Sequence, residues 1–438
     1  MTGIFTNLGS TVAEVLEDLA DIFGSSVLTS AAVLTPGSGY SIDQNITISG
    51  GTSITTTSFV QFRVRGIDAN GGVTAFHITN HGAYSSVPSS PGSGSAPSGG
   101  TAATFDLTFG ATPWTVERNV FSSPEREVIL SSGGVYVGMR TFTLTGQQNI
   151  EFAGFSGYSA GDTWDDQPGI SPGRYDGGGE SGAFWVMAGS GAYGTFIFFN
   201  DRRIMMRTTL PGASVRQTCY LGLLKPVYPS AAPAGYIAEP APMYICGSYT
   251  KPDEPWTSTL KIHLVNNPIS TLVSSTGPGY YRDSAGAWQS VRNGYGVYAA
   301  PPARYYTRTF DNVVTPLGLS FEALTDLTDS ANRIVGDLPY FGHTTGDTMP
   351  IDNLEGVSEP QLFQPIPTTS GPSRTLIPCV IVSQSPDRVI GELDGVYAYP
   401  SELTVLSSAR VYAQDGRAYL VFHGQYSVPM SRAAFEEI

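Results

Sequence analysis

Short runs of bulky and β-branched residues, separated by turn residues, recur along the chain and predict strands. The densest pair of runs lies within residues 194–209, where they flank Asn200-Asp201. Asparagine and aspartate tolerate the backbone conformations that a hairpin turn requires. We therefore predict a hairpin here, within a mainly antiparallel core that occupies residues 138–229 and carries aromatic-rich loops at its rim.

The remaining expected strands have the same composition. They are residues 59–65, 105–109, 114–121, 127–130, 134–140, 149–152, 243–247, 260–265, 375–382 and 396–399. A second hairpin is expected over residues 409–422, because Asp415-Gly416 is a strong signal for a type I′ turn. Together these elements predict a mainly β fold with an antiparallel, β-sandwich-like core.

One stretch, residues 5–23, has helical periodicity. Its apolar residues recur at steps of three and four and form one stripe, namely Leu8, Val12, Val15, Leu16, Leu19, Ile22 and Phe23. Thr11 and Glu14 can form a capping box if the helix begins late, and Gly24 stands where helices usually end. We expect the stripe to pack on the chain's own core. The alternative is a docking helix for a neighbouring subunit.

Residues 31–109 are rich in Gly, Ser and Thr and carry a weak internal repeat. Tyr40 and Tyr84 lie 44 residues apart in similar surroundings. Each is followed by Ser-Gly-Gly, at Ser49 and Ser98, and then by an expected strand. Self-similarity of this kind predicts two duplicated supersecondary units, which together make a small β domain rather than a long solenoid.

Residues that interrupt helices and strands stand at both ends of this block. This predicts that the block is an insertion into the core. An insertion at an exposed loop costs little additional loop-closure entropy. The expected parts are an N-terminal helix packed on the core (1–24), the inserted Gly/Ser-rich β domain (25–111), the central antiparallel core (112–250), a loop- and tyrosine-rich region (251–370) and C-terminal strands that complete the core (371–438). Residues 85–100 are of low complexity and are expected to form a mobile loop.

Composition supports this architecture and narrows the function. The 438 residues include 51 Gly and 31 Pro, and only 14% are charged, as expected for many short strands joined by tight turns. The formal charge of −14 argues against a nucleic-acid surface, which needs clustered Lys and Arg. No apolar run approaches the roughly 20 residues that span a bilayer, and the N-terminus lacks a secretory signal.

Candidate chemistry is sparse. The three cysteines, Cys219, Cys246 and Cys379, allow at most one bridge, and buried free thiols are the favoured interpretation. Five histidines are scattered, at positions 77, 81, 263, 343 and 423, without metal-site spacing. His77 and His81 lie across a Gly/Asn turn and are interpreted as loop residues. Residues 177–182 match a dinucleotide-binding glycine pattern but lack its strand and helix, and they also fail the pattern of a hydrolase nucleophile.

Two further groups of residues leave alternatives open. Asp162, Asp165 and Asp166 form the best acidic cluster, which can bind Ca²⁺ if loop carbonyls join it. The favoured interpretation is that they cap turns in a rigid loop beside Trp164 and Pro168. The aromatic residues of the tyrosine-rich region are Tyr280, Tyr281, Trp288, Tyr295, Tyr298, Tyr305 and Tyr306. They form either a binding face or ordinary loop anchors.

Several stretches resemble virion structural proteins of tailed bacteriophages. The shared features are the Leu-rich N-terminal helix, a strand like residues 114–119, and residues 157–169, 196–206, 220–224, 282–288 and 395–399. Pro36-Gly-Ser-Gly-Tyr40 is similar to a Gly-rich module of phage tail and fibre proteins. The resemblance covers residues 1–24 and 112–438, and the Gly/Ser-rich block departs from the plain pattern.

This resemblance implies a non-enzymatic part of the virion, made in the host cytoplasm and placed in the tail, at its neck or collar or in its baseplate. The implied partners are copies of the chain in a cyclic assembly and other virion proteins, with no nucleic acid, membrane, cofactor, metal or catalytic residue. The alternative is a tail-fibre or tip adhesin whose tyrosine-rich loops bind host cell-surface glycan. A depolymerase ranks third, because neither a β-helix repeat nor a carboxylate pair in a cleft is evident.

Overall fold

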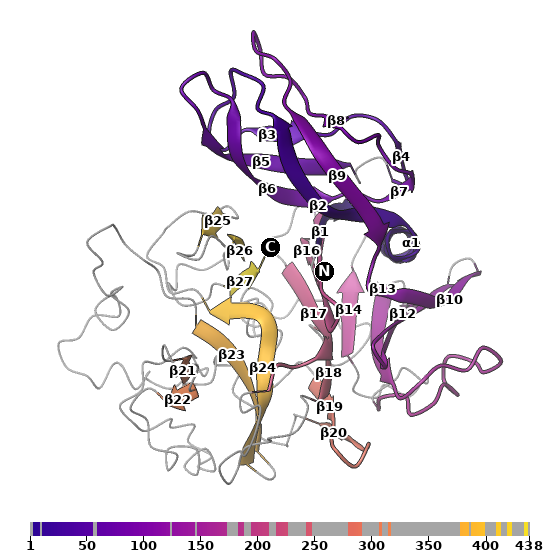
Figure 1. Ribbon diagram of the computed structural model, residues 1–438. Helices are drawn as coiled ribbons and strands as arrows, with labels where there is room; N and C mark the ends of the chain where they lie inside the picture. The colour runs from indigo at the N-terminus through magenta and orange to yellow at the C-terminus, as the bar shows by residue number, and fades with distance from the viewer. Residues whose placement is uncertain are drawn as a thin grey trace.

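The computed structural model describes residues 3–8, 11–55, 59–122, 125–144, 147–172, 183–187, 194–209, 216–226, 242–247, 279–290, 306–308, 314–316, 377–384, 387–398, 409–412, 418–422 and 433–436. This part of the chain consists of antiparallel sheets and one α-helix, which confirms the mainly β prediction (Figure 1). No helix in the same part is long and apolar enough to cross a membrane.

Seven antiparallel strands form the largest sheet. In order across it they are β1 (Gly3–Leu8), β15 (Gly194–Phe199), β16 (Arg203–Thr209), β17 (Arg216–Leu223), β18 (Met243–Cys246), β19 (Gly279–Arg282) and β20 (Trp288–Ser290). The hairpin predicted over residues 194–209 is confirmed as β15 and β16. Its turn is held by Asn200, whose Oδ1 accepts the N–H groups of Arg202 at 2.8 Å and Arg203 at 2.9 Å.

A second sheet is a five-stranded antiparallel meander. Its strands, in chain order and in sheet order, are β10 (Thr115–Ser122), β11 (Glu125–Ser132), β12 (Val135–Leu144), β13 (Gln147–Phe155) and β14 (Ala183–Met187). The first four are the strands expected between residues 114 and 152; β10 is shifted by one residue, and the other three are longer than expected. Trp114 precedes β10, and its Nε1 donates to the carbonyl of Asn200 at 2.6 Å. That bond ties the second sheet to the hairpin turn of the first.

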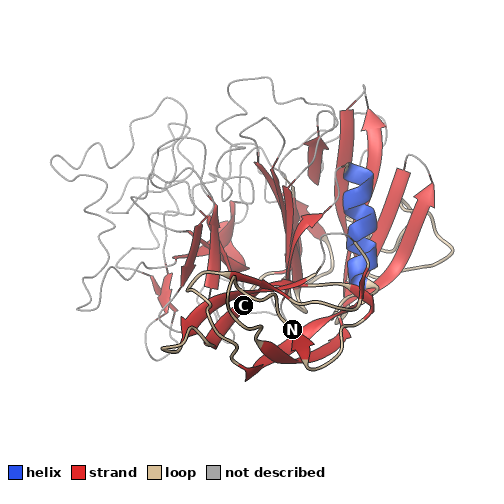
Figure 2. Ribbon diagram, turned by 90° about the horizontal axis from the view of Figure 1, so that it is seen from above, coloured by secondary structure: helices blue, strands red, loops and turns tan. Residues whose placement is uncertain are grey.

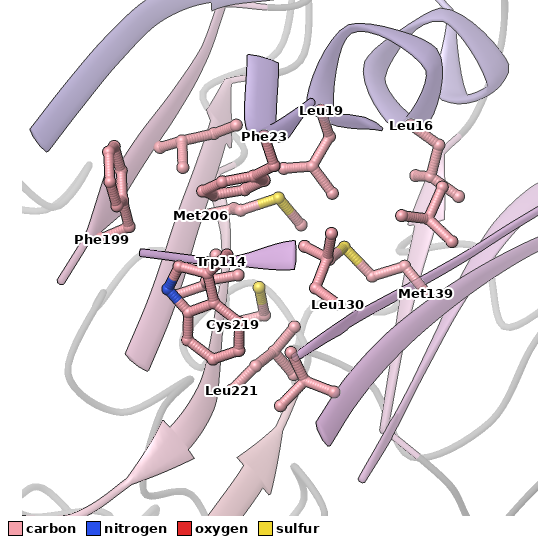
Figure 3. Close-up of a cluster of buried hydrophobic side chains, with 14 of the residues drawn as sticks. Leu16, Leu19, Phe23, Trp114, Leu130, Met139, Phe199, Met206, Cys219 and Leu221 are labelled. Carbon is pink, nitrogen blue, oxygen red and sulfur yellow. The ribbon is translucent and has the colours of Figure 1, made fainter. Parts of the chain in front are cut away.

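One apolar core joins these two sheets to the helix. The helix contributes Leu16, Leu19 and Phe23, and the sheets contribute Leu130, Met139, Phe199, Met206, Cys219 and Leu221, with Trp114 between them (Figure 3). The ring of Phe23 meets that of Phe199 edge to face, with centroids 5.2 Å apart. The prediction that the apolar stripe packs on the chain's own core is confirmed.

The helix, α1 (Val12–Phe23), is drawn in blue in Figure 2. It begins later than its apolar pattern indicates. The prediction of a helix from residue 5 is wrong, because residues 3–8 form β1 and pair with β15 in the register Gly3↔Phe199. Pairing along an existing strand gives the main-chain groups of this segment partners without a helix. The capping box is confirmed: Thr11 Oγ1 accepts the N–H of Glu14 at 3.2 Å, and the Glu14 carboxylate accepts the N–H of Thr11 at 3.1 Å.

Residues 26–111 form two sheets of their own, which we call the module. One sheet has the order β4 (Thr52–Ser53), β7 (Tyr84–Ser86), β2 (Ser26–Thr35), β9 (Thr104–Ala111), β8 (Gly92–Ser93), and the other has the order β3 (Asn45–Thr47), β5 (Val60–Ile67), β6 (Val73–His81). A separate cluster of buried side chains fills the space between them. Strand β8 falls within residues 85–100, where a loop was expected, and pairs with β9.

The two repeat units of the module are interleaved. The first unit supplies β2, β3 and β5, and the second supplies β6, β8 and β9. Strand β5 pairs with β6 of the other unit, and β9 pairs with β2 of the other unit. Phe62 and Phe105, at matching places in β5 and β9, meet with ring centroids 4.8 Å apart. Neither unit therefore has a complete sheet without its counterpart.

The C-terminal strands form a further five-stranded antiparallel sheet. Its order is β23 (Ile377–Gln384), β24 (Asp387–Ala398), β27 (Ala433–Glu436), β26 (Ala418–Phe422), β25 (Ala409–Tyr412), and a separate pair is formed by β21 (Tyr306–Arg308) and β22 (Val314–Pro316). The second predicted hairpin corresponds to β25 and β26, which pair with each other. The strand expected at residues 260–265 and the Asp415-Gly416 turn lie outside the described residues.

Candidate interaction loop

The segment between β13 and residue 171 forms a closed loop, which we call the Ω-loop (residues 156–170). Its base is joined by two main-chain bonds, from the N–H of Ser156 to the carbonyl of Pro168 and from the N–H of Ser171 to the carbonyl of Gly154, both 2.8 Å long. Loops with joined ends and internal packing are compact surface features that are frequently functional. This loop is therefore the candidate site that we describe in most detail.

The Ω-loop is anchored to its sheet by a buried carboxylate. Glu151 is fully buried, and its Oε1 accepts the indole N–H of Trp164 at 3.2 Å while its Oε2 accepts from Arg140 Nη2 at 2.9 Å. A buried charge is costly unless it is paired and hydrogen-bonded, so these two donors are required at this place. The Trp164 ring also packs edge to face on Phe155, with centroids 5.3 Å apart.

Arg140 connects the sheet to the outside of the loop. It is the direct cross-strand neighbour of Glu151, so the register of β12 and β13 brings the two charges together. Its guanidinium lies 5.4 Å from the Trp164 ring centroid, and its Nη1 pairs with Asp165 Oδ2 at 3.1 Å. Burial lowers the pKa of Arg140, but Glu151 and Asp165 outweigh that effect and the pKa is raised. The arginine therefore stays charged in this site.

Gln167 holds the interior of the loop. Its side chain is buried, and its Nε2 lies within hydrogen-bonding distance of the carbonyls of Ser159, Asp162 and Thr163 at 2.9 to 3.2 Å. Its Oε1 accepts the N–H of Ser159 at 3.0 Å. The Gln167 side chain thus supplies hydrogen-bond partners to inward-facing main-chain groups of the loop, as a neighbouring strand does within a sheet.

Two further contacts fix the loop to the rest of the molecule. Arg118 on β10 pairs with Glu127 at 2.6 Å and also donates to the carbonyl of Asp162 at 3.3 Å. Trp288 at the start of β20 donates its indole N–H to the carbonyl of Gly169 at 2.8 Å. The Ω-loop therefore joins the edge of the meander to the far edge of the seven-stranded sheet.

The acidic residues of the loop serve the loop itself. Asp165 pairs with Arg140, and Asp166 accepts a hydrogen bond from Thr163 Oγ1 at 2.6 Å. Among the described residues, no three His, Cys, Asp or Glu side chains lie together as metal ligands would. The Asp166 contact fits the turn-capping interpretation, whereas the Asp165 contact joins the loop to the sheet, and neither contact supports a Ca²⁺ site.

The other residues singled out in the sequence are dispersed. The interpretation of His77 and His81 as loop residues is wrong, because both lie in β6 and are largely buried; the polar residues of this strand hide it in the sequence. The remaining three histidines and residues 177–182 lie outside the described residues. Cys219 and Cys246 are buried free thiols, as predicted, and burial raises the pKa of Cys246 to about 12. Cys379 lies in β23.

The described aromatic residues of the tyrosine-rich region behave as anchors. Tyr280 and Tyr281 on β19 are buried, and Trp288 packs against the main core besides holding Gly169. Tyr306 lies in β21, and Tyr295, Tyr298 and Tyr305 lie outside the described residues. The anchor interpretation is therefore supported for the first three, and no binding face is formed by them.

The chemistry available at the Ω-loop is that of recognition. Its exposed residues include Ala160, Thr163, Asp165 and Asp166, which offer hydroxyl and carboxylate groups on a rigid frame. The residues that make the frame, Arg140, Glu151 and Gln167, were not singled out from the sequence. Comparison with models of protein families gave no match, and comparison with curated proteins gave no significant match either.

Proposed function

We propose that the chain is a non-enzymatic structural subunit of a tailed bacteriophage virion. In this proposal it is built into the tail, at the neck or collar or in the baseplate, through contacts with copies of itself and with other virion proteins in a cyclic assembly. The proposal rests on the resemblance carried by the sequence and on one structural observation, the rigid and polar Ω-loop.

Rigidity is the property that suits such a loop to assembly. A surface that is already ordered loses little conformational entropy when a partner binds, so more of the contact energy appears as affinity. Two buried side chains, Glu151 and Gln167, order the Ω-loop from within, and the exposed contacts Arg140–Asp165 and Thr163–Asp166 add to this order. Its outer face is therefore free to be covered by a neighbouring subunit.

The use of buried charge also supports a structural role. Glu151 and Arg140 join a loop to a sheet, and Arg203 and Asp394 join β16 to β24, which are distant in the sequence. In an enzyme, buried ionisable groups typically face a cleft in which substrate binds. In the described part of this chain, these groups connect segments to one another.

The test is incorporation into particles. Virions from cells infected by the parent phage are purified, and the copy number of the chain is measured by quantitative gel densitometry. A multiple of three or six is expected for a cyclic assembly. An absent or sub-stoichiometric band would contradict the proposal.

A surface variant tests the Ω-loop directly. Thr163→Arg adds a large cation to the exposed face of the loop, and Asn119→Arg adds the same group to the exposed part of β10 as a matched control. Both variants should fold, but only Thr163→Arg should be lost from particles when supplied in place of the parent chain. Normal incorporation of both variants would exclude the Ω-loop as the assembly surface.

The adhesin alternative predicts a different result. A host-recognition protein should bind host cells saturably and compete with phage adsorption. The buried positions of Tyr280 and Tyr281 do not favour it, because a glycan-binding face needs exposed rings. Saturable binding that blocks adsorption would nevertheless replace the structural proposal with this one.

A further inference from the structure

A group of cations surrounds one carboxylate where the hairpin turn meets β24. Asp394 accepts from Asn200 Nδ2 at 2.6 Å and lies 3.5 Å from Lys225 Nζ. Its main-chain carbonyl, not its carboxylate, accepts from Arg203 Nε at 2.9 Å. Arg202 is close enough to act on the same carboxylate, and its Nη2 donates to the carbonyl of Leu224 at 2.7 Å. We call these residues the clasp.

The clasp has more positive than negative charge. Arg202, Arg203 and Lys225 are three cations, and among the described side chains Asp394 is the one carboxylate that partners them. Two positive charges are therefore in excess, in a chain whose formal net charge is −14. Buried charges are ordinarily matched by opposite charges, because removing an ion from water is costly.

Donors in the clasp are also left without acceptors. Arg203 is 1% exposed, and its Nη1 is buried with no hydrogen-bond partner. The Nε of Arg202 is buried and unpartnered in the same way. Tyr220 is not the acceptor of either group: its hydroxyl donates to the carbonyl of Leu223 at 2.7 Å and accepts the N–H of Asp394 at 3.2 Å. Each of the two guanidinium groups thus has a buried nitrogen whose N–H has no acceptor.

We propose that the clasp binds a doubly charged oxyanion of the phosphate or sulfate class. Such an ion matches the two excess charges and supplies the acceptor oxygens that the two arginines need. Lys225 is one-third exposed, so it provides the side from which the ion enters from solvent. Lysine acts as a point charge toward phosphate, and the arginines supply directional donors.

The experiment uses the full chain and inorganic phosphate or sulfate as probes. Thermal unfolding is followed as each anion is titrated in the millimolar range against chloride and acetate at constant ionic strength. Phosphate and sulfate should raise the midpoint saturably, whereas chloride and acetate should not. An equal effect of chloride would overturn the proposal, and an equal effect of acetate would overturn the assignment to a doubly charged ion.

Variants separate site binding from the general salt effect, in which excluded phosphate and sulfate stabilise any protein. Lys225→Gln and Arg202→Gln avoid the fully buried arginine, and each should weaken the apparent phosphate affinity about tenfold. Arg63→Gln, which removes a cation from a surface pair with Asp43, is the matched control and should leave the affinity unchanged. An undiminished phosphate effect in both clasp variants would mean that any ion bound there is adventitious only, and would overturn the proposal.

Discussion

Tyr40 and Tyr84 occupy matching places in the two units of the module, and the hydroxyl of each accepts a main-chain N–H from the other unit. Tyr40 accepts from Ala103, and Tyr84 accepts from Val60, both at 2.9 Å. The two acceptors thus reinforce the exchange of strands between units. The 44-residue spacing of these tyrosines in the sequence corresponds to a repeated hydrogen bond between the units.

Replacing either tyrosine with phenylalanine should destabilise the protein while keeping the ring packing. Each change leaves a buried N–H without its acceptor, which costs about 1–3 kcal/mol. Tyr40→Phe should cost more than Tyr84→Phe, because the Tyr40 hydroxyl also donates to the carbonyl of Ser95 at 2.9 Å. Denaturant unfolding monitored by circular dichroism measures both effects. Equal stability of Tyr40→Phe and the parent would show that this hydroxyl is not needed.

Glu151→Gln should loosen the Ω-loop. The change removes one partner of a buried ion pair, but Arg140 retains Asp165, so we expect a loss of about 2–3 kcal/mol, below the usual range for a broken buried pair. Hydrogen exchange over residues 156–171 should become faster. Glu125→Gln, at an exposed position on β11 of the same sheet, is the control and should stay within about 0.5 kcal/mol of the parent. Unchanged exchange in Glu151→Gln would contradict the anchoring role.

Asp394→Asn should lower stability in a pH-dependent way. Burial raises the pKa of Asp394, but Arg203, the Asn200 hydrogen bond, Lys225 and Arg202 outweigh it and lower the pKa below its ordinary value of 3.8. A carboxylate with a depressed folded-state pKa contributes stability above its unfolded pKa, and that contribution is lost as the pH falls through the folded pKa.

The free-energy difference between parent and Asp394→Asn should therefore be constant above about pH 5 and should shrink as the pH falls below 3.8. Urea unfolding at a series of pH values gives this difference directly. A difference that grows toward acid pH would contradict the assigned direction of the pKa shift.

Excision of the module tests the predicted domain division. Replacing residues 25–111 with a short Gly/Ser linker should leave a soluble core with one cooperative unfolding transition. The core should be somewhat less stable than the parent, since Val27 and Ala83 of the module belong to the main apolar cluster, and a buried valine contributes about 1.5–3 kcal/mol. Aggregation, or loss of the cooperative transition, would show that the module is part of the core.

Local signals in the sequence predicted local features well. Asn200 indicated the central hairpin, and the capping box expected of Thr11 and Glu14 forms, because each of these side chains acts within three residues of itself. The apolar pattern predicts a helix that begins too early, because Leu8 continues the apolar spacing, whereas β1 depends on β15, almost two hundred residues away. Pairing at that distance leaves no mark on the local pattern.

The candidate site shows the same limit. A rigid loop beside Trp164 was predicted, but its supports were not, since Glu151 and Arg140 look like ordinary charged residues of strands. Only the cross-strand register of β12 and β13 makes them neighbours. Gln167 is equally inconspicuous, and its role comes from a loop conformation that closes around it.

The pairing of β1 with β15 also has a consequence for synthesis. Residues 3–8 leave the ribosome long before their partner strand β15, which ends at Phe199, has been translated. The module, whose last strand ends at Ala111, has all its strands available well before that point. The first strand to emerge thus gains its neighbour only after strands β2 to β14 have been translated, and a nascent chain stalled before residue 199 would present it unpaired to chaperones and proteases.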